Sequence, residues 1–180
     1  LMIPGLPAPL HYFNFLTIIG QPNAPMLRNE HAIKHSALDT VSLISSISPH
    51  IVGHSNGYSI QDDCQFEQSQ FTFGERECLK GTIPHFQLIR RDDELSVNLH
   101  IETKPVISHF TKFKFGLFDH WSLMCHCTGE IVYKGQSYSI NHLGSFEYAR
   151  AMNFPYLPLC FFTYQIINLN NQRQLLLAQI

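Results

Sequence analysis

The segment that decides the fold lies at residues 94–102 and reads Glu-Leu-Ser-Val-Asn-Leu-His-Ile-Glu. Apolar residues occupy every second position, and polar residues stand between them. Side chains of a β-strand point alternately to the two sides of a sheet, so this pattern is typical of a strand with one buried face and one solvated face. From Leu95 to Ile101 the sequence therefore predicts part of an antiparallel sheet that covers an apolar interior.

A β-hairpin is predicted further along the chain, around the dipeptide Lys134-Gly135. With these two residues as its turn, Cys127 faces His142 across the hairpin. This register is self-consistent, because it gathers most of the apolar side chains on one side. That side contains Trp121, Leu123, Cys125, Cys127, Ile131, Tyr133, Tyr138, Ile140 and His142.

The remaining segments extend the same architecture. A second hairpin is expected around Asn170-Asn171, between strands at residues 159–169 and 173–180. Residues 1–57 are punctuated by prolines and predict an irregular N-terminal wrap with short strands at 10–18 and 40–47. Residues 58–180 then form the barrel domain. Many strands joined by short turns predict an all-β fold with a closed or nearly closed antiparallel barrel.

Composition excludes several classes of protein. The chain has 180 residues, of which 44% are hydrophobic and only 14% charged, and a formal net charge of -2. This balance argues against a disordered chain and against a nucleic-acid binder, which needs clustered Lys and Arg. No stretch reaches the about 20 apolar residues of a transmembrane helix. The five cysteines form an odd set without a C-x-x-C spacing, which favours free thiols in a cytoplasmic protein.

Four short motifs resemble an uncharacterised bacterial family of unknown function. They are the run at residues 3–12 (IPGLPAPLHY), the Asp62-Asp63-Cys64 step, His120-Trp121-Ser122-Leu123 followed by Gly129, and the run at residues 143–150 (LGSFEYAR). That family is itself loosely similar to tandem lipocalin-like proteins, which include carotenoid hydratases and tocopherol cyclase. The resemblance spans most of the chain.

The resemblance implies a lipocalin-like barrel that lines a pocket for an isoprenoid or another hydrophobic molecule. No catalytic residue carries over from the family. In the tandem proteins a second barrel follows the first, so the resemblance also implies that a chain ending at Ile180 lacks a partner barrel.

Aromatic residues are the main sign of a pocket. The chain contains 14 Phe, seven Tyr and one Trp, which either fill a solid core or line a cavity for a flat apolar ligand. The aromatic residues predicted to contact a ligand are Trp121, Tyr133, Tyr138 and Phe146. Composition leaves the hollow and the filled barrel open as alternatives.

Three residues are candidates for acid–base chemistry: Glu147, His142 and His120. A Glu147 side chain buried beside aromatic rings would have a raised pKa and could protonate an alkene or a carbonyl group. The alternative is a structural ion pair between Glu147 and Arg150 that closes the barrel end. A nucleophilic pair of Cys127 and His142 has the same cross-strand geometry but no visible orienting group or oxyanion hole.

Cys125, Cys127 and His142 are also candidate metal ligands, because two thiols at i and i+2 and a cross-strand imidazole could reach one zinc ion. The C-x-C spacing differs from that of a zinc knuckle, and free cysteine is among the most buried residue types. Buried thiols in an apolar wall are therefore the favoured interpretation, and no cofactor is predicted.

The sequence thus favours a binding protein for a hydrophobic small molecule such as a lipid or isoprenoid. Two alternatives remain open: an isomerase, hydratase or cyclase with an ionisable group in the cavity, and an inert interaction or scaffold domain whose aromatic residues fill the barrel.

Overall fold

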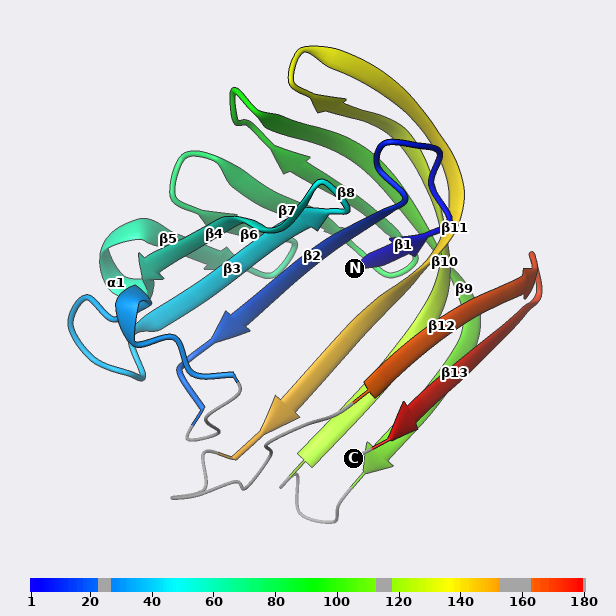
Figure 1. The fold of residues 1–180 in the computed structure, drawn as a ribbon. Coiled ribbons are helices and arrows are strands. Elements are labelled where there is room, and N and C mark those ends of the chain that lie inside the picture. The colour runs from blue at the N-terminus through cyan, green and yellow to red at the C-terminus, as the bar shows by residue number, and fades with distance from the viewer. Residues whose placement is uncertain (23–26, 113–117, 153–162, 180) are drawn as a thin grey trace.

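A computed structural model describes residues 1–22, 27–112, 118–152 and 163–179. Within these residues, 11 strands form one antiparallel sheet in the order β4-β3-β2-β1-β11-β10-β9-β8-β7-β6-β5. The sheet curls into a nearly closed barrel (Figure 1), which confirms the all-β antiparallel prediction. The strands of the sheet are β1 (Met2–Pro4), β2 (Tyr12–Ile19), β3 (Thr40–Ile47), β4 (His50–Ser59), β5 (Cys64–Glu67), β6 (Gln70–Phe73), β7 (Glu77–Thr82), β8 (His85–Arg90), β9 (Leu95–Lys112), β10 (Phe118–Tyr133) and β11 (Gln136–Ala151).

The N-terminal segment supplies strands β1 to β4 of this sheet, and the expected boundary at residues 57 and 58 lies inside β4. Strands form here because the prolines fall at their margins: Pro4 ends β1, and the stretch around Pro7 and Pro9 makes the turn to β2. A short helix α1 (Ile60–Asp63) follows β4, and the Ser59 side chain caps it by accepting from the Asp62 backbone N–H.

The predicted central hairpin is confirmed in register. Strands β10 and β11 pair so that Cys127 faces His142, and the turn falls at Lys134-Gly135. Both turn residues have positive φ angles, 49° and 78°, as a two-residue hairpin turn requires. On the other side, β10 pairs with β9, which contains the alternating segment from Leu95 to Ile101.

The barrel interior is a packed apolar core. The alternating residues of β9, from Leu95 to Ile101, are at most 2% exposed. They join side chains from β2, β3, β10 and β11 in one cluster. Because the cluster draws on strands from both ends of the sheet, burial of this interior is the main force that curls the sheet.

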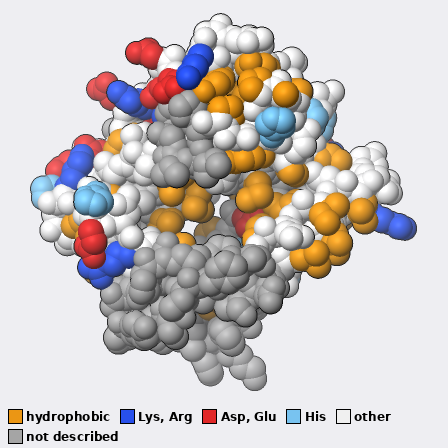
Figure 2. Space-filling view, in the orientation of Figure 1, with side chains coloured by type: hydrophobic (Ala, Val, Ile, Leu, Met, Phe, Trp, Pro, Cys, Tyr) orange, Lys and Arg blue, Asp and Glu red, His pale blue; other side chains and the backbone are white. Residues whose placement is uncertain are grey.

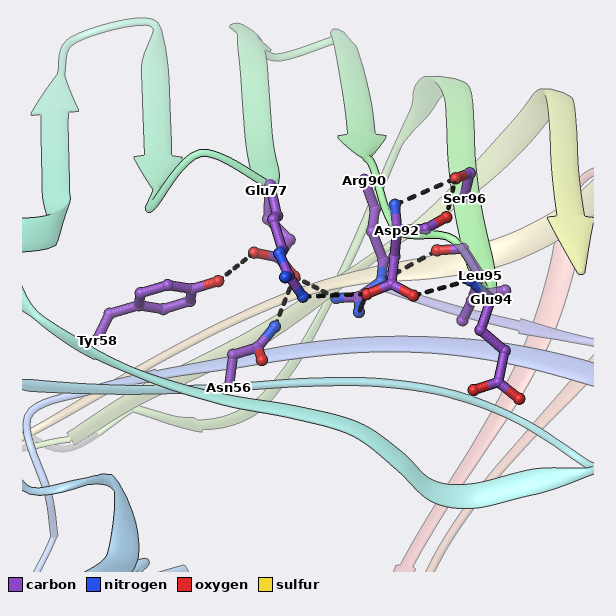
Figure 3. Close-up of polar contacts among 9 residues, drawn as sticks. Asn56, Tyr58, Glu77, Arg90, Asp92, Glu94, Leu95 and Ser96 are labelled. Atoms are coloured by element: carbon purple, nitrogen blue, oxygen red, sulfur yellow. Dashed lines mark hydrogen bonds and ion pairs between the residues drawn. The ribbon is translucent and has the colours of Figure 1, made fainter. Parts of the chain in front are cut away.

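Side chains, rather than a backbone ladder, close the seam between the two ends of the sheet. Glu77 of β7 accepts hydrogen bonds from Tyr58 (2.6 Å) and Asn56 (2.9 Å) of β4. It also forms a fully buried ion pair with Arg90 of β8, as Figure 3 shows. The Arg90 Nε donates to the Leu95 carbonyl at 3.2 Å, and its Nη2 lies 3.3 Å from Asp92. Every charged group of this network therefore has a partner.

Strands β9 to β11 extend beyond the barrel. The pairing of β8 with β9 reaches Glu102, although β9 continues to Lys112. Beyond that point a second hairpin lies beside the three long strands; it consists of β12 (Thr163–Asn170) and β13 (Arg173–Gln179) (Figure 1). Side chains dock it onto β11, because Asn168 donates to the Leu143 carbonyl and Gln174 to the Gly144 carbonyl.

The turn of this second hairpin lies one residue later than the sequence indicated. Asn170 pairs with Arg173, so Asn171 and Gln172 form the turn. Among the described helices, none combines the length and the apolar character that crossing a membrane requires.

Candidate functional site

Along the long strands β9 to β11, the two faces of the sheet differ in what covers them. Phe146 and Glu147 are neighbours in β11 and therefore point to opposite sides. Phe146 points into the barrel and stacks on Phe86, with ring centroids 4.5 Å apart. Glu147 points to the other side, where Tyr164 of β12 meets it. The face that is solvated along the barrel is thus covered further along by the β12–β13 hairpin.

Glu147 is the centre of a polar cluster on this hairpin-covered face. Its Oε1 accepts a hydrogen bond from the Tyr164 hydroxyl at 2.6 Å and another from Ser145 at 3.2 Å. Its Oε2 lies 3.4 Å from Nε2 of His120. Ser145 in turn contacts Ser122, with 2.5 Å between their hydroxyl oxygens. The cluster therefore joins three strands: β10, β11 and β12.

Aromatic rings form the apolar part of the same site. The ring of Phe110 stacks on the imidazole of His120, with centroids 4.4 Å apart, and meets Tyr164 edge-on at 5.6 Å. Phe118 also meets the His120 ring edge-on, with centroids 6.3 Å apart. The site is thus a carboxylate and an imidazole set between aromatic side chains.

The charge state of Glu147 follows from its donors. Burial acts to raise the pKa of its carboxyl group, but hydrogen bonds with His120 and Tyr164 outweigh burial, and the pKa lies below its usual value. Burial and the hydrogen bond to the carboxylate raise the pKa of Tyr164 far above its usual range. Glu147 is therefore a carboxylate at neutral pH, and Tyr164 stays a neutral hydrogen-bond donor.

This charge state changes the chemistry expected of Glu147. A carboxylate with a lowered pKa suits an acceptor or an orienting group and is a poor proton donor, contrary to the raised pKa that burial alone predicted. The alternative ion pair with Arg150 is not formed: Glu147 pairs with His120, and Arg150 is an exposed residue three positions further along the strand, on its other side.

Of the three acid–base candidates, the structure brings Glu147 and His120 together and places His142 elsewhere. His142 faces Cys127 and is half-buried on the Phe146 side of β11. The predicted cross-strand pair of Cys127 and His142 is thus present in the backbone register, but it does not belong to the Glu147 cluster.

The two thiols of the proposed metal set are buried in the barrel core. The sulfur atoms of Cys125 and Cys127 are 3.6 Å apart. The hydrogen bond with Cys125, followed by burial, raises the pKa of Cys127 far above its usual range, so its thiol stays protonated. Throughout the described part of the chain, no three His, Cys, Asp or Glu side chains are grouped so that they could hold a metal ion.

Three of the four aromatic residues predicted to contact a ligand take part in the packing of the barrel. Tyr133 belongs to the buried core, and Tyr138 and Phe146 pack against it. Trp121 stacks on Tyr148 outside that cluster, with ring centroids 5.3 Å apart. Their role as ligand contacts stays a prediction.

Sequence reasoning missed Tyr164 and Phe110, which complete the candidate site. Tyr164 lies in a predicted strand, but no local signal shows that its hydroxyl meets Glu147 from a different hairpin. Ser122 and Ser145, the two other polar members of the site, are only 2% and 0% exposed, and nothing in the sequence indicated this burial.

A second polar feature lies on the outer face of β8 to β10. A shallow hollow there is lined by His85, Phe86, His100, Ile101, Glu102, His126 and Thr128. Two of its polar groups already have local partners: Glu102 accepts from Lys104 at 2.8 Å, and His126 contacts Asn141 at 2.6 Å. Its polar lining and open shape do not fit a hydrophobic ligand.

Fold and site together define an antiparallel β-barrel protein with an apolar core and a separate polar–aromatic site beside it. Residues 16–180 match the model of DUF6670, a family of unknown function, and the chain belongs to this family. No curated protein gives a significant match, and neither does any solved structure.

Proposed function

We propose that the protein binds a hydrophobic small molecule on the hairpin-covered face, with Glu147, His120 and Tyr164 as its polar anchor. One observation carries this proposal: a charged carboxylate is bound by Tyr164 and His120, whose rings both contact Phe110, yet about a quarter of its side chain, 26%, remains exposed. The side chain of His120 is exposed to the same extent. Polar groups that converge in an aromatic setting and stay accessible are the usual composition of a small-molecule site.

Stability of the fold alone does not account for this cluster. A half-buried carboxylate loses part of its hydration and needs hydrogen-bond donors in return, whereas an apolar residue at position 147 would need none. The donors around Glu147 come from separate strands and hold it in the charged form. This arrangement supports a role in recognition.

The location differs from the cavity that the sequence suggested. The barrel interior is occupied by the packed core, in which Leu99 and Ile131 are fully buried. Figure 2 shows that the face in view is hollowed near its centre, with hydrophobic side chains around the opening and an acidic side chain at its edge. A ligand site beside the barrel needs no rearrangement of the core.

The resemblance to lipocalin-like proteins supports a binding role but not this position of the ligand. A cytoplasmic location also stays part of the proposal, and the free thiols of the four described cysteines agree with it. An isomerase, hydratase or cyclase is the second candidate. It is favoured only by the contact of His120 with Glu147, since a carboxylate beside an imidazole can orient it as a general base.

Native mass spectrometry of freshly purified protein tests the proposal directly. We expect a bound organic molecule that denaturation releases. The neutral fluorescent dye Nile red gives a second readout: it should bind with one-to-one stoichiometry, and Phe110→Ala should weaken its binding by about tenfold because the ring that stacks on His120 is lost.

Phe66→Ala is the matched control, because Phe66 is a partly exposed aromatic residue on the β5 edge strand, outside the Glu147 cluster. It should leave the affinity for Nile red unchanged. If wild-type protein binds no Nile red, or if the two variants weaken binding equally, the proposed site is wrong. A filled scaffold domain would give the first of these results.

A further inference from the structure

The charges around Glu147 indicate which kind of hydrophobic molecule the site accepts. Within the described residues, the ion pair of Glu147 is with His120, and no Lys or Arg takes part. The amino group of Leu1 acts on Glu147 through space, but burial lowers its pKa and it donates to the Phe15 carbonyl at 2.8 Å. The donors that hold the carboxylate are thus Tyr164, Ser145 and His120, and no Lys or Arg side chain of the described residues pairs with it.

The two oxygens of Glu147 are unequally occupied. Oε1 accepts from both Tyr164 and Ser145, whereas Oε2 has the 3.4 Å contact with His120. That contact is long for an N–H···O hydrogen bond. Since each carboxylate oxygen can accept about two hydrogen bonds, Oε2 retains capacity for a donor from a ligand.

The surrounding rings favour positive charge as well. Phe110 and Tyr164 meet at the carboxylate edge of the site, and aromatic faces attract a cation through the negative potential of the ring. A second carboxylate in the same place would lie against Glu147 in a partly desolvated setting, where like charges repel strongly.

We propose that the ligand of this site is an amphipathic amine, an apolar molecule whose protonated amino group binds Oε2 of Glu147. This inference rests on the proposed binding function and names the chemistry of its ligand. The apolar part lies against Phe110 and Phe118, and the ammonium group replaces water at the exposed edge of the carboxylate. The site then discriminates against fatty acids with the same tail.

Three probes with one tail and different head groups test the inference: dodecylamine, dodecanol and sodium dodecanoate. Each is titrated below its critical micelle concentration against the 180-residue chain loaded with Nile red. We expect dodecylamine to displace the dye at about tenfold lower concentration than dodecanol, because a hydrogen bond to a charged group is stronger than one between neutral groups. Dodecanoate should be the weakest of the three.

Glu147→Gln is the critical variant, because it keeps the size and the acceptor oxygen of the side chain and removes the charge. It should bring the affinity for dodecylamine to that for dodecanol and relieve the penalty against dodecanoate. Glu130→Gln is the matched control: Glu130 is an exposed residue of the same strand pair, opposite Ser139, and its loss should leave the order of the probes unchanged. Circular dichroism of each variant checks that it is folded.

The outcomes separate the inference from the proposed function. Equal displacement by amine, alcohol and acid would overturn the amine inference and leave binding of a hydrophobic molecule standing. Retention of the amine preference in Glu147→Gln would overturn it too. If none of the three probes displaces Nile red, the proposed function fails and the inference fails with it.

Discussion

The phenol hydroxyl of Tyr58 donates a 2.6 Å hydrogen bond to Oε2 of Glu77, and this contact joins the two ends of the 11-stranded sheet. Tyr58 belongs to β4, one edge strand, whereas Glu77 belongs to β7, near the other edge (Figure 3). Burial, followed by the hydrogen bond to Glu77, raises the pKa of Tyr58 above its usual range. Tyr58 therefore remains a hydrogen-bond donor across the physiological pH range.

Removal of this donor should weaken the barrel seam. Tyr58→Phe leaves the buried Glu77 carboxylate without one of its partners, and we expect a loss of about 1.5–3 kcal/mol in the free energy of unfolding. Urea denaturation measures this change. Tyr148→Phe, at an exposed position 43% accessible to solvent, should change the same quantity by less than about 0.5 kcal/mol. Equal effects of the two substitutions would contradict a closing role for Tyr58.

The buried ion pair of Glu77 and Arg90 should respond asymmetrically to substitution. Arg90→Met leaves a buried carboxylate without its cation, and we expect it to cost about 3–5 kcal/mol. The double variant Arg90→Met/Glu77→Gln removes both charges and should be more stable than Arg90→Met alone. Denaturation of the wild type, both single variants and the double variant gives the coupling energy, and additive effects would contradict the pairing.

Gly129 should be intolerant of any side chain. Its φ angle is 136°, and an added Cβ would lie 2.2 Å from the Asn98 carbonyl oxygen of β9. Gly129→Ala must therefore displace backbone in the centre of the sheet, and we expect a loss of at least about 3 kcal/mol. At Gly135, in the turn, φ is also positive but nothing lies within 4 Å, so Gly135→Ala should cost only about 1–2 kcal/mol. Thermal unfolding compares the two variants.

Glu147 should contribute to stability in a pH-dependent way. Its pKa is lowered from 4.5 on folding, so it stabilises the fold above that value, and the contribution disappears as the pH falls through the folded-state pKa. The difference in unfolding free energy between wild type and Glu147→Gln should therefore shrink as the pH is lowered from about 5.5 to about 3, a range in which most imidazoles are already protonated. A constant difference over this range would contradict the lowered pKa.

The fold was predictable where the pattern is local. The alternation from Leu95 to Ile101 and the turn at Lys134-Gly135 are sufficient to assign strands and register, because a shift by one residue would expose the apolar set. The prolines were a weaker guide, since a proline that lies at the margin of a strand does not prevent pairing. The sequence predicted no helix at α1, because four residues are too few to show a helical period.

The candidate site was predictable only in part, for a physical reason. Its members Glu147 and His120 lie on paired strands, and each was predictable as a candidate because its side chain can take part in acid–base chemistry. Tyr164 meets them through the docking of a separate hairpin, which depends on tertiary contacts such as that of Asn168 with the Leu143 carbonyl. The direction of the Glu147 pKa shift depends on these donors, so burial alone gave the opposite sign.

Strands β9 to β11 run without interruption from the barrel core to the Glu147 cluster, and this continuity has a mechanical consequence. The backbone pairs that carry Glu147 and His120 belong to the same ladder as those of Cys127 and Ile131, so this part of the site is built on the backbone of the barrel. The β10–β11 part of the site is therefore preorganised: its amides should exchange with deuterium more slowly than those of the β12–β13 hairpin, and ligand uptake should cost this part little ordering entropy.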